Sequence, residues 1–272
     1  MGKKVAFYII IGVALCLVLL PIVWLVLTSF KTKADIFAVP PQWLPSKIVL
    51  KNYTEQFTEG PVFRVLINSV LIAVVTVVSV IIIATPAAYS FARYRFRGEL
   101  PILILILIMR MIPVISIVIP LFIVFSRLGL LDTCVALIII QIACKIPLAI
   151  WILKGFFSTI PKEIEECAML DGCSLGGVLT KIILPLAKPG IAASAVIAFI
   201  YTWNDLLITL AISATVASRT LPVQLTQFVM EFRVVWERMC ALGVIMLIPA
   251  VVFIFLAEKG LLKGLLLGSI KE

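Results

Sequence analysis

The chain has 272 residues, of which 63% are hydrophobic and 14% charged, and its mean hydropathy is +1.23. A soluble domain carries about 45–50% apolar and about 25% charged residues, so the composition excludes an ordinary soluble globule. A helix needs about 20 apolar residues to cross a bilayer, and six such spans would use about half of the chain. We therefore expect an all-α integral membrane protein, with residues 1–272 forming a single transmembrane domain.

Several kinds of chemistry are excluded by the residues that the sequence lacks. It contains no histidine, which removes a histidine general base, a Ser-His-Asp triad and an HExxH zinc site. It has no Gly-x-x-x-x-Gly-Lys-Ser/Thr loop for ATP phosphates. The cysteines are scattered without a Cys-x-x-Cys pair: Cys16, Cys134, Cys144, Cys167, Cys173 and Cys240. We expect no catalytic residue, no metal site and no cofactor bound by this chain.

The expected spans, in chain order, cover about residues 5–30, 62–92, 100–126, 134–157, 189–212 and 240–257. Residues 31–61 are hydrophilic and predict an outer loop with little regular structure. Residues 158–188 form the only long charged segment between spans.

Positive charge gives the orientation. The formal net charge is +9, and the Lys and Arg residues lie mainly between the apolar runs, as topology signals and lipid headgroups require. Nucleic-acid binding is therefore not expected. Arg93, Arg95 and Arg97 cluster in one short loop between two clear spans, which favours a cytoplasmic position for that loop and for both termini. We therefore expect the chain to lie in the inner membrane of the cell.

The 158–188 segment predicts two short helices joined at a glycine. Pro161 suits a first helical turn, Asp171-Gly172 favours a turn, and Ser174 can cap a second helix that ends at Leu184-Pro185. Such a knob on the cytoplasmic face could dock in a groove of another protein, or it could lie on the membrane surface as an amphipathic hairpin. Periodicity alone leaves both interpretations open.

A family resemblance distinguishes them. Glu166-Cys167-Ala168, followed by Gly172 and by Ile182-x-Leu184-Pro185, closely resembles the EAA loop of ABC-importer permeases. Further segments resemble the carbohydrate-uptake subgroup, and within it the six-span subunit of the maltose-permease-G type: Asn68-Ser69, residues 92–98, residues 149–157, Trp203-Asn204-Asp205 and residues 263–271. The resemblance implies six transmembrane helices with a cytoplasmic coupling loop between the fourth and fifth.

The resemblance also implies roles for single residues of the coupling loop. Glu166 would pair with a basic group of a cytoplasmic ATPase, Ala168 would pack closely, and Gly172 would set the bend. The matching motif positions also include Asp171, Leu184 and Pro185. ATP and Mg would be bound by the partner ATPase, whose closure would drive the permease between inward-open and outward-open states.

Polar residues within the apolar runs are candidates for a solute pathway, because an unpaired charge in a span is costly. The candidates are Arg110, Gln141, Trp203, Asn204 and Asp205. In the structural alternative, Lys145 or Arg110 neutralises Asp205, or these cations reach a membrane interface. Trp203 could stack on a sugar face or lie at an interface.

We therefore expect a permease subunit of an ATP-driven importer for a sugar or oligosaccharide, forming half of the translocation pathway and performing no covalent chemistry. The expected partners are a second homologous permease, two ATPase subunits, an extracytoplasmic solute-binding protein and the lipid bilayer. The main alternative is a stand-alone secondary transporter of a small polar solute, for which Asp205 is the only plausible ion-coupling carboxylate. A membrane enzyme and a channel lack their characteristic motifs.

Overall fold

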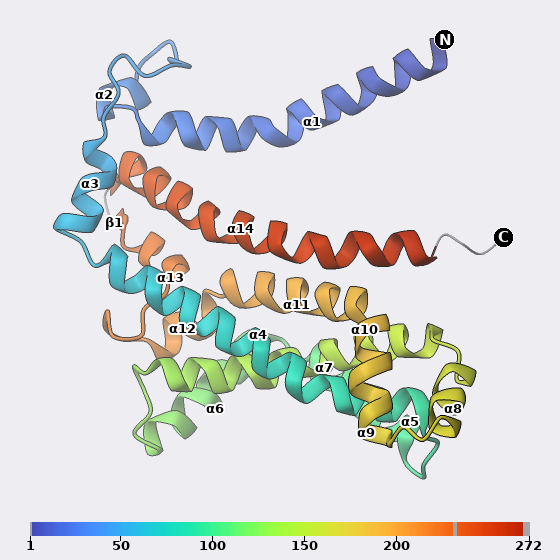
Figure 1. Ribbon diagram of the computed structural model, residues 1–272. Helices are drawn as coiled ribbons and strands as arrows, with labels where there is room; N and C mark the ends of the chain where they lie inside the picture. Colours follow the sequence, from blue (N-terminus) through green and yellow to red (C-terminus); the bar gives the residue numbers. More distant parts are fainter. Residues whose placement is uncertain (1, 231–232, 269–272) are drawn as a thin grey trace. The chain divides into compact units, whose positions relative to one another are not determined.

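The computed structural model describes residues 2–230 and 233–268, with side chains for residues 4–229 and 234–257 (Figure 1). Within this part the chain is helical, apart from an antiparallel pair of two-residue strands, β1 (Val229–Met230) and β2 (Arg233–Val234). The chain divides into two compact units, one made of residues 1–66 and 221–249 and the other of residues 67–220 and 250–272. Residues 269–271 of the family-like tail lie outside the described residues.

The first unit contains α1 (Gly2–Ser29), α2 (Lys33–Ile36), α3 (Lys51–Thr58), α13 (Leu221–Thr226) and the start of α14 (Trp236–Gly268). The apolar run of α1 is not buried by the rest of the protein, as expected of a helix that faces lipid. The expectation of little regular structure at residues 31–61 was wrong in part, because α2 and α3 lie there. A capping box between Thr32 and Asp35 starts α2.

Side-chain amides of α3 join the elements of this first unit. Asn52 donates from Nδ2 to the carbonyl oxygens of Ser29 at 2.9 Å and Lys31 at 3.2 Å. These bonds satisfy backbone carbonyls at the C-terminal end of α1. Gln56 donates from Nε2 to the carbonyl oxygen of Arg238 at 3.1 Å, and the Arg238 side chain pairs with Glu55. The polar residues of α3 are thus used to hold α1 and the first turns of α14.

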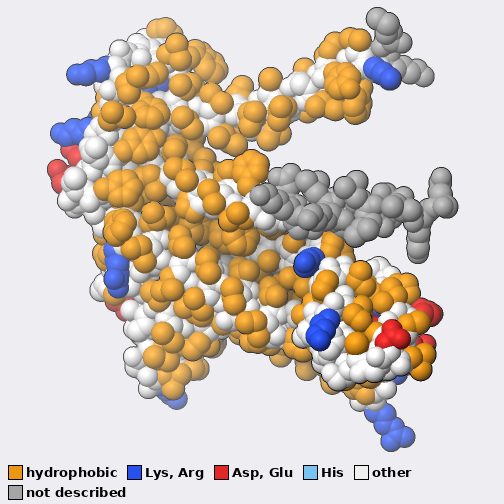
Figure 2. All heavy atoms as spheres, viewed as in Figure 1, with side chains coloured by type: hydrophobic (Ala, Val, Ile, Leu, Met, Phe, Trp, Pro, Cys, Tyr) orange, Lys and Arg blue, Asp and Glu red, His pale blue; other side chains and the backbone are white. Residues whose placement is uncertain are grey.

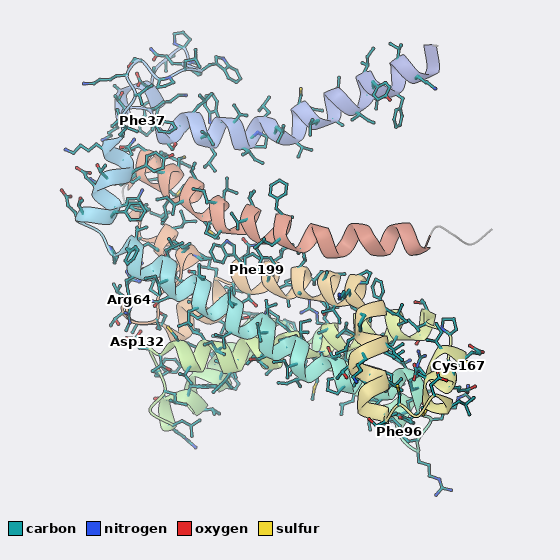
Figure 3. All side chains as sticks on the ribbon, in the orientation of Figure 1. Phe37, Arg64, Phe96, Asp132, Cys167 and Phe199 are labelled. Carbon is teal, nitrogen blue, oxygen red and sulfur yellow. The ribbon has the colours of Figure 1, made fainter. Side chains whose placement is uncertain are left out.

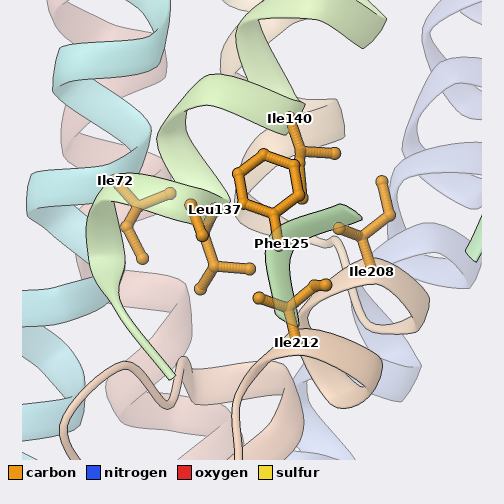
Figure 4. Close-up of a cluster of buried hydrophobic side chains, with 7 residues drawn as sticks. Ile72, Phe125, Leu137, Ile140, Ile208 and Ile212 are labelled. Atoms are coloured by element: carbon orange, nitrogen blue, oxygen red, sulfur yellow. The ribbon is translucent and has the colours of Figure 1, made fainter. Parts of the chain in front are cut away.

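The second unit is built around α7 (Cys134–Thr159), which packs against α5 (Glu99–Met111), α11 (Lys188–Trp203) and α12 (Leu207–Ile212). It also holds α6 (Val114–Arg127), which packs on α12, and most of α4 (Val62–Arg93). Figure 4 shows the buried apolar cluster formed where these helices meet: Ile72, Phe125, Leu137, Ile140, Ile208 and Ile212. Figure 2 shows hydrophobic side chains over most of the visible surface, as a lipid environment requires.

Four helices are long and apolar enough to cross a bilayer: Lys4–Ser29, Val62–Arg93, Cys134–Thr159 and Trp236–Ala257. Two bent helix pairs, Glu99–Met111 with Val114–Arg127 and Leu175–Leu186 with Lys188–Trp203, bring the number of candidate spans to as many as six. The described part of the chain therefore offers four to six spans.

Two of the expected spans are broken in the structure. The run at residues 100–126 is two helices that meet at 93°, because Pro113 has no N–H and holds Ile112 in an extended conformation at φ −66° and ψ 122°. The run at residues 189–212 is also interrupted, since α11 ends at Trp203 and α12 begins separately at Leu207. Pro86, Pro120 and Pro147, in contrast, lie inside continuous helices.

The packing of α11 on α7 depends on a glycine. A methyl group at Gly190 would lie 2.7 Å from both Cβ and Cδ2 of Phe156, closer than such atoms approach in proteins. Because Cβ is bonded to the backbone of α7, rotation of the Phe156 side chain does not remove this contact. Gly155, the neighbour of Phe156 on α7, has open space around it.

We expect Gly190→Ala to destabilise the protein by about 1–3 kcal/mol, because the added methyl group forces α11 away from α7. The matched control is Gly155→Ala, which should leave the stability unchanged or raise it by up to about 1 kcal/mol, since alanine favours a helix. The measurement is the thermal unfolding of both detergent-solubilised variants. Equal melting temperatures for the two variants would contradict the proposed packing constraint.

A second local feature is the clamp that Asp132 forms at the end of the second unit opposite to Cys167 (Figure 3). The carboxylate accepts hydrogen bonds from the backbone N–H groups of Ala214 at 3.0 Å and Thr215 at 2.9 Å and from Oγ of Ser218 at 2.8 Å. Burial raises the pKa of the Asp132 carboxyl, but a hydrogen bond from the Thr215 hydroxyl, together with the three others, outweighs it and brings the pKa below its ordinary value of 3.8.

The lowered pKa means that the clamp stabilises the loop fully above pH 3.8 and loses this contribution as the pH falls through the folded-state pKa. We expect the amides of Ala214 and Thr215 to be protected at neutral pH and to open on acidification. Hydrogen exchange, corrected for intrinsic rates, measures this protection. In Asp132→Asn the protection of these two amides should be weaker at neutral pH and should not change on acidification. The same acid-dependent opening in that variant would assign the effect to another group.

Candidate functional site

The 158–188 segment forms one charged end of the second unit. It consists of α8 (Glu163–Leu170), α9 (Leu175–Val178), the π-helical turn η1 (Leu179–Ile183) and α10 (Leu184–Leu186). Acidic side chains gather on this end in Figure 2, and Cys167 on α8 is labelled there in Figure 3. The two expected short helices are therefore present.

The turn between these helices explains the need for glycine. Gly172 has φ +89°, and the hydrogen bonds Gly172 N–H to Met169 O and Cys173 N–H to Ala168 O, both 3.0 Å, complete a Schellman motif at the end of α8. A residue with a Cβ is strained in this conformation. The expected turn at Asp171-Gly172 is confirmed by this geometry.

The second helix begins as expected and ends later. Ser174 caps α9 by accepting a hydrogen bond from the Gly177 N–H at 3.3 Å. The expected end at Leu184-Pro185 was early, because the helical path continues through Leu186 before it turns by 73° into α11. The π-helical turn places the Leu184 N–H on the carbonyl of Leu179, which lets the chain accommodate Pro185 and its missing N–H.

A buried ion pair attaches α8 to the end of α4. The Glu165 carboxylate pairs with Nε of Arg93 and accepts a 2.6 Å hydrogen bond from the hydroxyl of Tyr89, while Arg93 also donates from Nη2 to the carbonyl oxygen of Ile160 at 3.0 Å. Both charged side chains are less than a tenth exposed. This pair was not predicted from the sequence, where Arg93 was a topology signal and part of a family-like segment; the available signal was an acidic residue on the same helix face as the apolar Ala168.

The residues of the expected coupling motif differ in exposure. Glu166 and Asp171 are exposed beside Gly172, whereas Ala168 is buried against the rest of the knob. Pro185 is exposed and Leu184 is half-buried. The Glu166 carboxylate forms no salt bridge with any residue that the structure describes. The knob, residues 158–188, thus exposes the acidic side chains of Glu166 and Asp171. Its helix α8 is attached to α4 through the buried contacts of Glu165.

A separate cavity of about 690 Å³ lies at the other end of α11, and polar side chains line it together with apolar residues of α5, α6 and α12. The polar lining residues are Arg110, Lys145, Tyr201, Asn204 and Asp205. We call this space the charged cavity. The guanidinium carbon of Arg110 lies 4.8 Å, and the ammonium nitrogen of Lys145 lies 6.0 Å, from the centre of the Tyr201 ring.

The structure brings most of the expected solute-pathway residues together here. Arg110, Asn204 and Asp205 line the charged cavity, and Gln141 is buried and is not among the lining residues. Trp203 is not among the lining residues; its ring is buried and stacks on Phe199 at 5.3 Å. Tyr201 was not among the residues predicted from the sequence, because a tyrosine in an apolar run does not by itself indicate a site.

Asp205 accepts hydrogen bonds from Thr209 and is attracted by Lys145 without a direct ion pair. Its Oδ2 accepts hydrogen bonds from the backbone N–H of Thr209 at 3.1 Å and from the Thr209 hydroxyl at 3.0 Å. Among the described residues, neither Arg110 nor Lys145 forms a salt bridge with it. The charged cavity therefore contains two cations and one anion without a direct ion pair between them.

The buried pair at the knob predicts unequal effects for two adjacent glutamates. Glu165→Gln leaves the Arg93 guanidinium buried without a counter-ion, so we expect α8 to lose about 3 kcal/mol of local stability. Glu166→Gln removes an exposed charge and should change the stability by less than about 0.5 kcal/mol. Hydrogen exchange of residues 163–170 measures both effects. Similar exchange in the two variants would mean that the ion pair does not hold the knob.

Comparison with known proteins agrees with this architecture. Residues 81–259 match the model of the family described as "Binding-protein-dependent transport system inner membrane component". In the solved structure of a bacterial ABC transporter involved in the import of the acidic polysaccharide alginate, one chain is 23% identical with a TM-score of 0.79, over 94% of this chain and 95% of that one. This likeness shows a shared ABC-permease fold.

Relatives at higher identity cover nearly the whole chain. The trehalose transport system permease protein SugB of Mycobacterium tuberculosis is 34% identical, over 100% of both chains. The trehalose/maltose transport system permease protein MalG of Thermococcus litoralis is 33% identical over 97% of this chain and 96% of its own. The sulfoquinovosyl glycerol transport system permease protein SmoH of Agrobacterium fabrum is 32% identical over 93% of this chain and 89% of its own.

These matches confirm the expected transport subunit and decide against an enzyme and against a stand-alone secondary transporter. With the family model matching well over half of the residues, the chain belongs to the inner membrane components of binding-protein-dependent transport systems, as an ABC-importer permease.

Proposed function

We propose that this permease imports a sugar or oligosaccharide, and that the 158–188 segment is the loop through which a cytoplasmic ATPase drives it. The substrate class is supported by the relatives, whose names give trehalose, trehalose or maltose, and sulfoquinovosyl glycerol as their solutes. The complex would comprise a second homologous permease, two ATPase subunits that bind ATP and Mg, and an extracytoplasmic binding protein. The whole chain would act as one permease domain with six spans.

The observation that carries the coupling role is the exposed acidic knob on a fixed base. Glu165 and Arg93 hold α8 rigidly on α4, so a force applied to α8 is passed to the spans rather than absorbed by a loose loop. Glu166 is exposed beside this base and free to pair with a basic group of an ATPase. Ala168 is buried and lets α8 pack closely within the knob, and Gly172 with Asp171 sets the bend.

The remaining motif residues fit the same role. Pro185 and Leu184 close the π-helical turn that leads from the knob to α11, the helix that reaches the charged cavity. In that cavity Arg110, Asn204 and Asp205, with Gln141 behind Asp205, would contact the solute. We propose that Trp203 supports this site by fixing the end of α11 through its stacking on Phe199.

The proposed orientation places both termini and the knob in the cytoplasm. Its support is that Arg95 and Arg97, exposed in the short loop after α4, lie next in sequence to Arg93, which contacts the knob. A cluster of arginines in a short loop favours the cytoplasmic side. Asp132 and its clamp, at the opposite end of the same unit, would then face outward (Figure 3).

The test compares Gly172→Asp with Gly129→Asp in the tagged chain, purified in mild detergent from its native membrane. Both glycines have positive φ, +89° and +66°, and a Cβ added at either would meet no neighbouring atom, so each substitution places an aspartate in a turn that favours glycine. We expect the wild type to co-purify with an ATPase and a second permease, and Gly172→Asp to lose the ATPase and at least about tenfold of ATP-driven uptake, since strain of about 1–3 kcal/mol distorts the docking turn.

Gly129→Asp, on the loop between α6 and α7, should keep both the ATPase and most of the uptake. Normal uptake by Gly172→Asp would count strongly against the coupling assignment. Equal losses in the two variants would assign the effect to general destabilisation. Recovery of the chain without any ATPase, repeated in several detergents, would contradict the proposed complex.

A further inference from the structure

The charged cavity holds a buried cation that forms no direct ion pair with any residue that the structure describes. Lys145 lines this cavity and is only 9% exposed. Within the described part of the chain, its ammonium group forms no hydrogen bond and no salt bridge; the Tyr201 ring lies 6.0 Å away, and the Asp205 carboxylate attracts the ammonium group without direct contact. A buried ammonium group is unfavourable unless an anion or several hydrogen-bond acceptors complete its surroundings.

Asp205 fills this role only in part. Its carboxylate accepts hydrogen bonds from the backbone and hydroxyl of Thr209, it attracts Lys145 without direct contact, and it forms no salt bridge with either cation. Arg110 faces the same Tyr201 ring at 4.8 Å and adds a second positive charge. The cavity therefore carries one positive charge in excess of its single carboxylate.

The geometry around Tyr201 suits an anion attached to a polar body. The guanidinium of Arg110 can bind a carboxylate, sulfonate or phosphate through two parallel hydrogen bonds, and the Lys145 ammonium adds a point charge. Asn204 donates from Nδ2 to the carbonyl oxygen of Ile200 at 2.9 Å, which leaves its amide oxygen available to a hydroxyl group. The volume of about 690 Å³ accommodates a small sugar.

We infer that the solute carried by this permease is an anionic sugar, one with a carboxylate, sulfonate or phosphate group that Arg110 and Lys145 bind in the charged cavity. The inference rests on the proposed sugar-import function and specifies its substrate class. Arg110 and Lys145 would thereby select against neutral sugars of the same size, because only an anion satisfies both cations.

The test uses the complete importer, reconstituted with its partners in lipid vesicles. The probes are a disaccharide that ends in a uronic acid and the neutral disaccharide of the same linkage. We expect faster uptake of the acidic probe, and a decrease of at least about tenfold in Lys145→Gln and in Arg110→Gln, as expected for the loss of one charged hydrogen bond. The matched control is Arg127→Gln, which removes an exposed cation of the same unit outside the cavity.

Faster uptake of the neutral probe, or an equal loss of both probes in Lys145→Gln, overturns the inference. Release of the second permease from Lys145→Gln also overturns it, because the counter-ion would then come from that subunit. If neither probe is transported, the melting temperature of the purified complex decides: the acidic probe should raise it in the wild type and not in Lys145→Gln, and no rise in the wild type contradicts the inference.

The proposed function is checked on the same preparation. Co-purification of the ATPase and its ATP hydrolysis are measured in the wild type and in Arg127→Gln without any solute. If the ATPase is absent there, the coupling proposal fails whatever the solute. If the ATPase is present and active but the acidic probe has no advantage, only the inference about an anionic solute fails.

Discussion

The buried contact of Glu165 with Arg93 and Tyr89 is the interaction on which the proposed coupling depends. Its donors lie at the end of α4 and its acceptor lies on the exposed helix α8, so two elements separated by some 70 residues are fixed together. Breaking such a pair leaves an uncompensated charge in a region of low dielectric, so the contact is held strongly in place. Without it, the knob would be attached to the spans by its chain connections and apolar contacts alone.

The sequence predicted the elements that are decided by local chemistry. The long apolar runs gave α4 as 62–92 and α7 as 134–157, within two residues of the observed ends. The turn at Gly172 and the cap at Ser174 were also predictable, because both depend on backbone preferences of single residues. Such features need no knowledge of distant contacts.

Features that depend on packing between distant segments could not be predicted in the same way. Hydropathy treated residues 100–126 as one run, because a proline is tolerated in many spans; only the surroundings decide that Pro113 breaks the helix while Pro120 does not. The pairing of Glu165 with Arg93 and the position of Tyr201 between two cations are likewise contacts of the folded chain. The polar residues of the charged cavity were foreseen by type, but not their partners.

The helix α11 connects the two candidate sites within the second unit. It has 16 residues, so it spans about 24 Å from the bend after α10 to Tyr201 and Asn204 at the charged cavity. Near its start, Gly190 lies directly against Phe156 of α7, and this close contact leaves no space for independent sliding. A displacement of the knob would therefore reach the cavity as a movement of α11 together with α7, the two helices that carry Tyr201 and Lys145. Coupling through rigid packed helices would in this way pass a displacement of the knob to the helices that line the cavity.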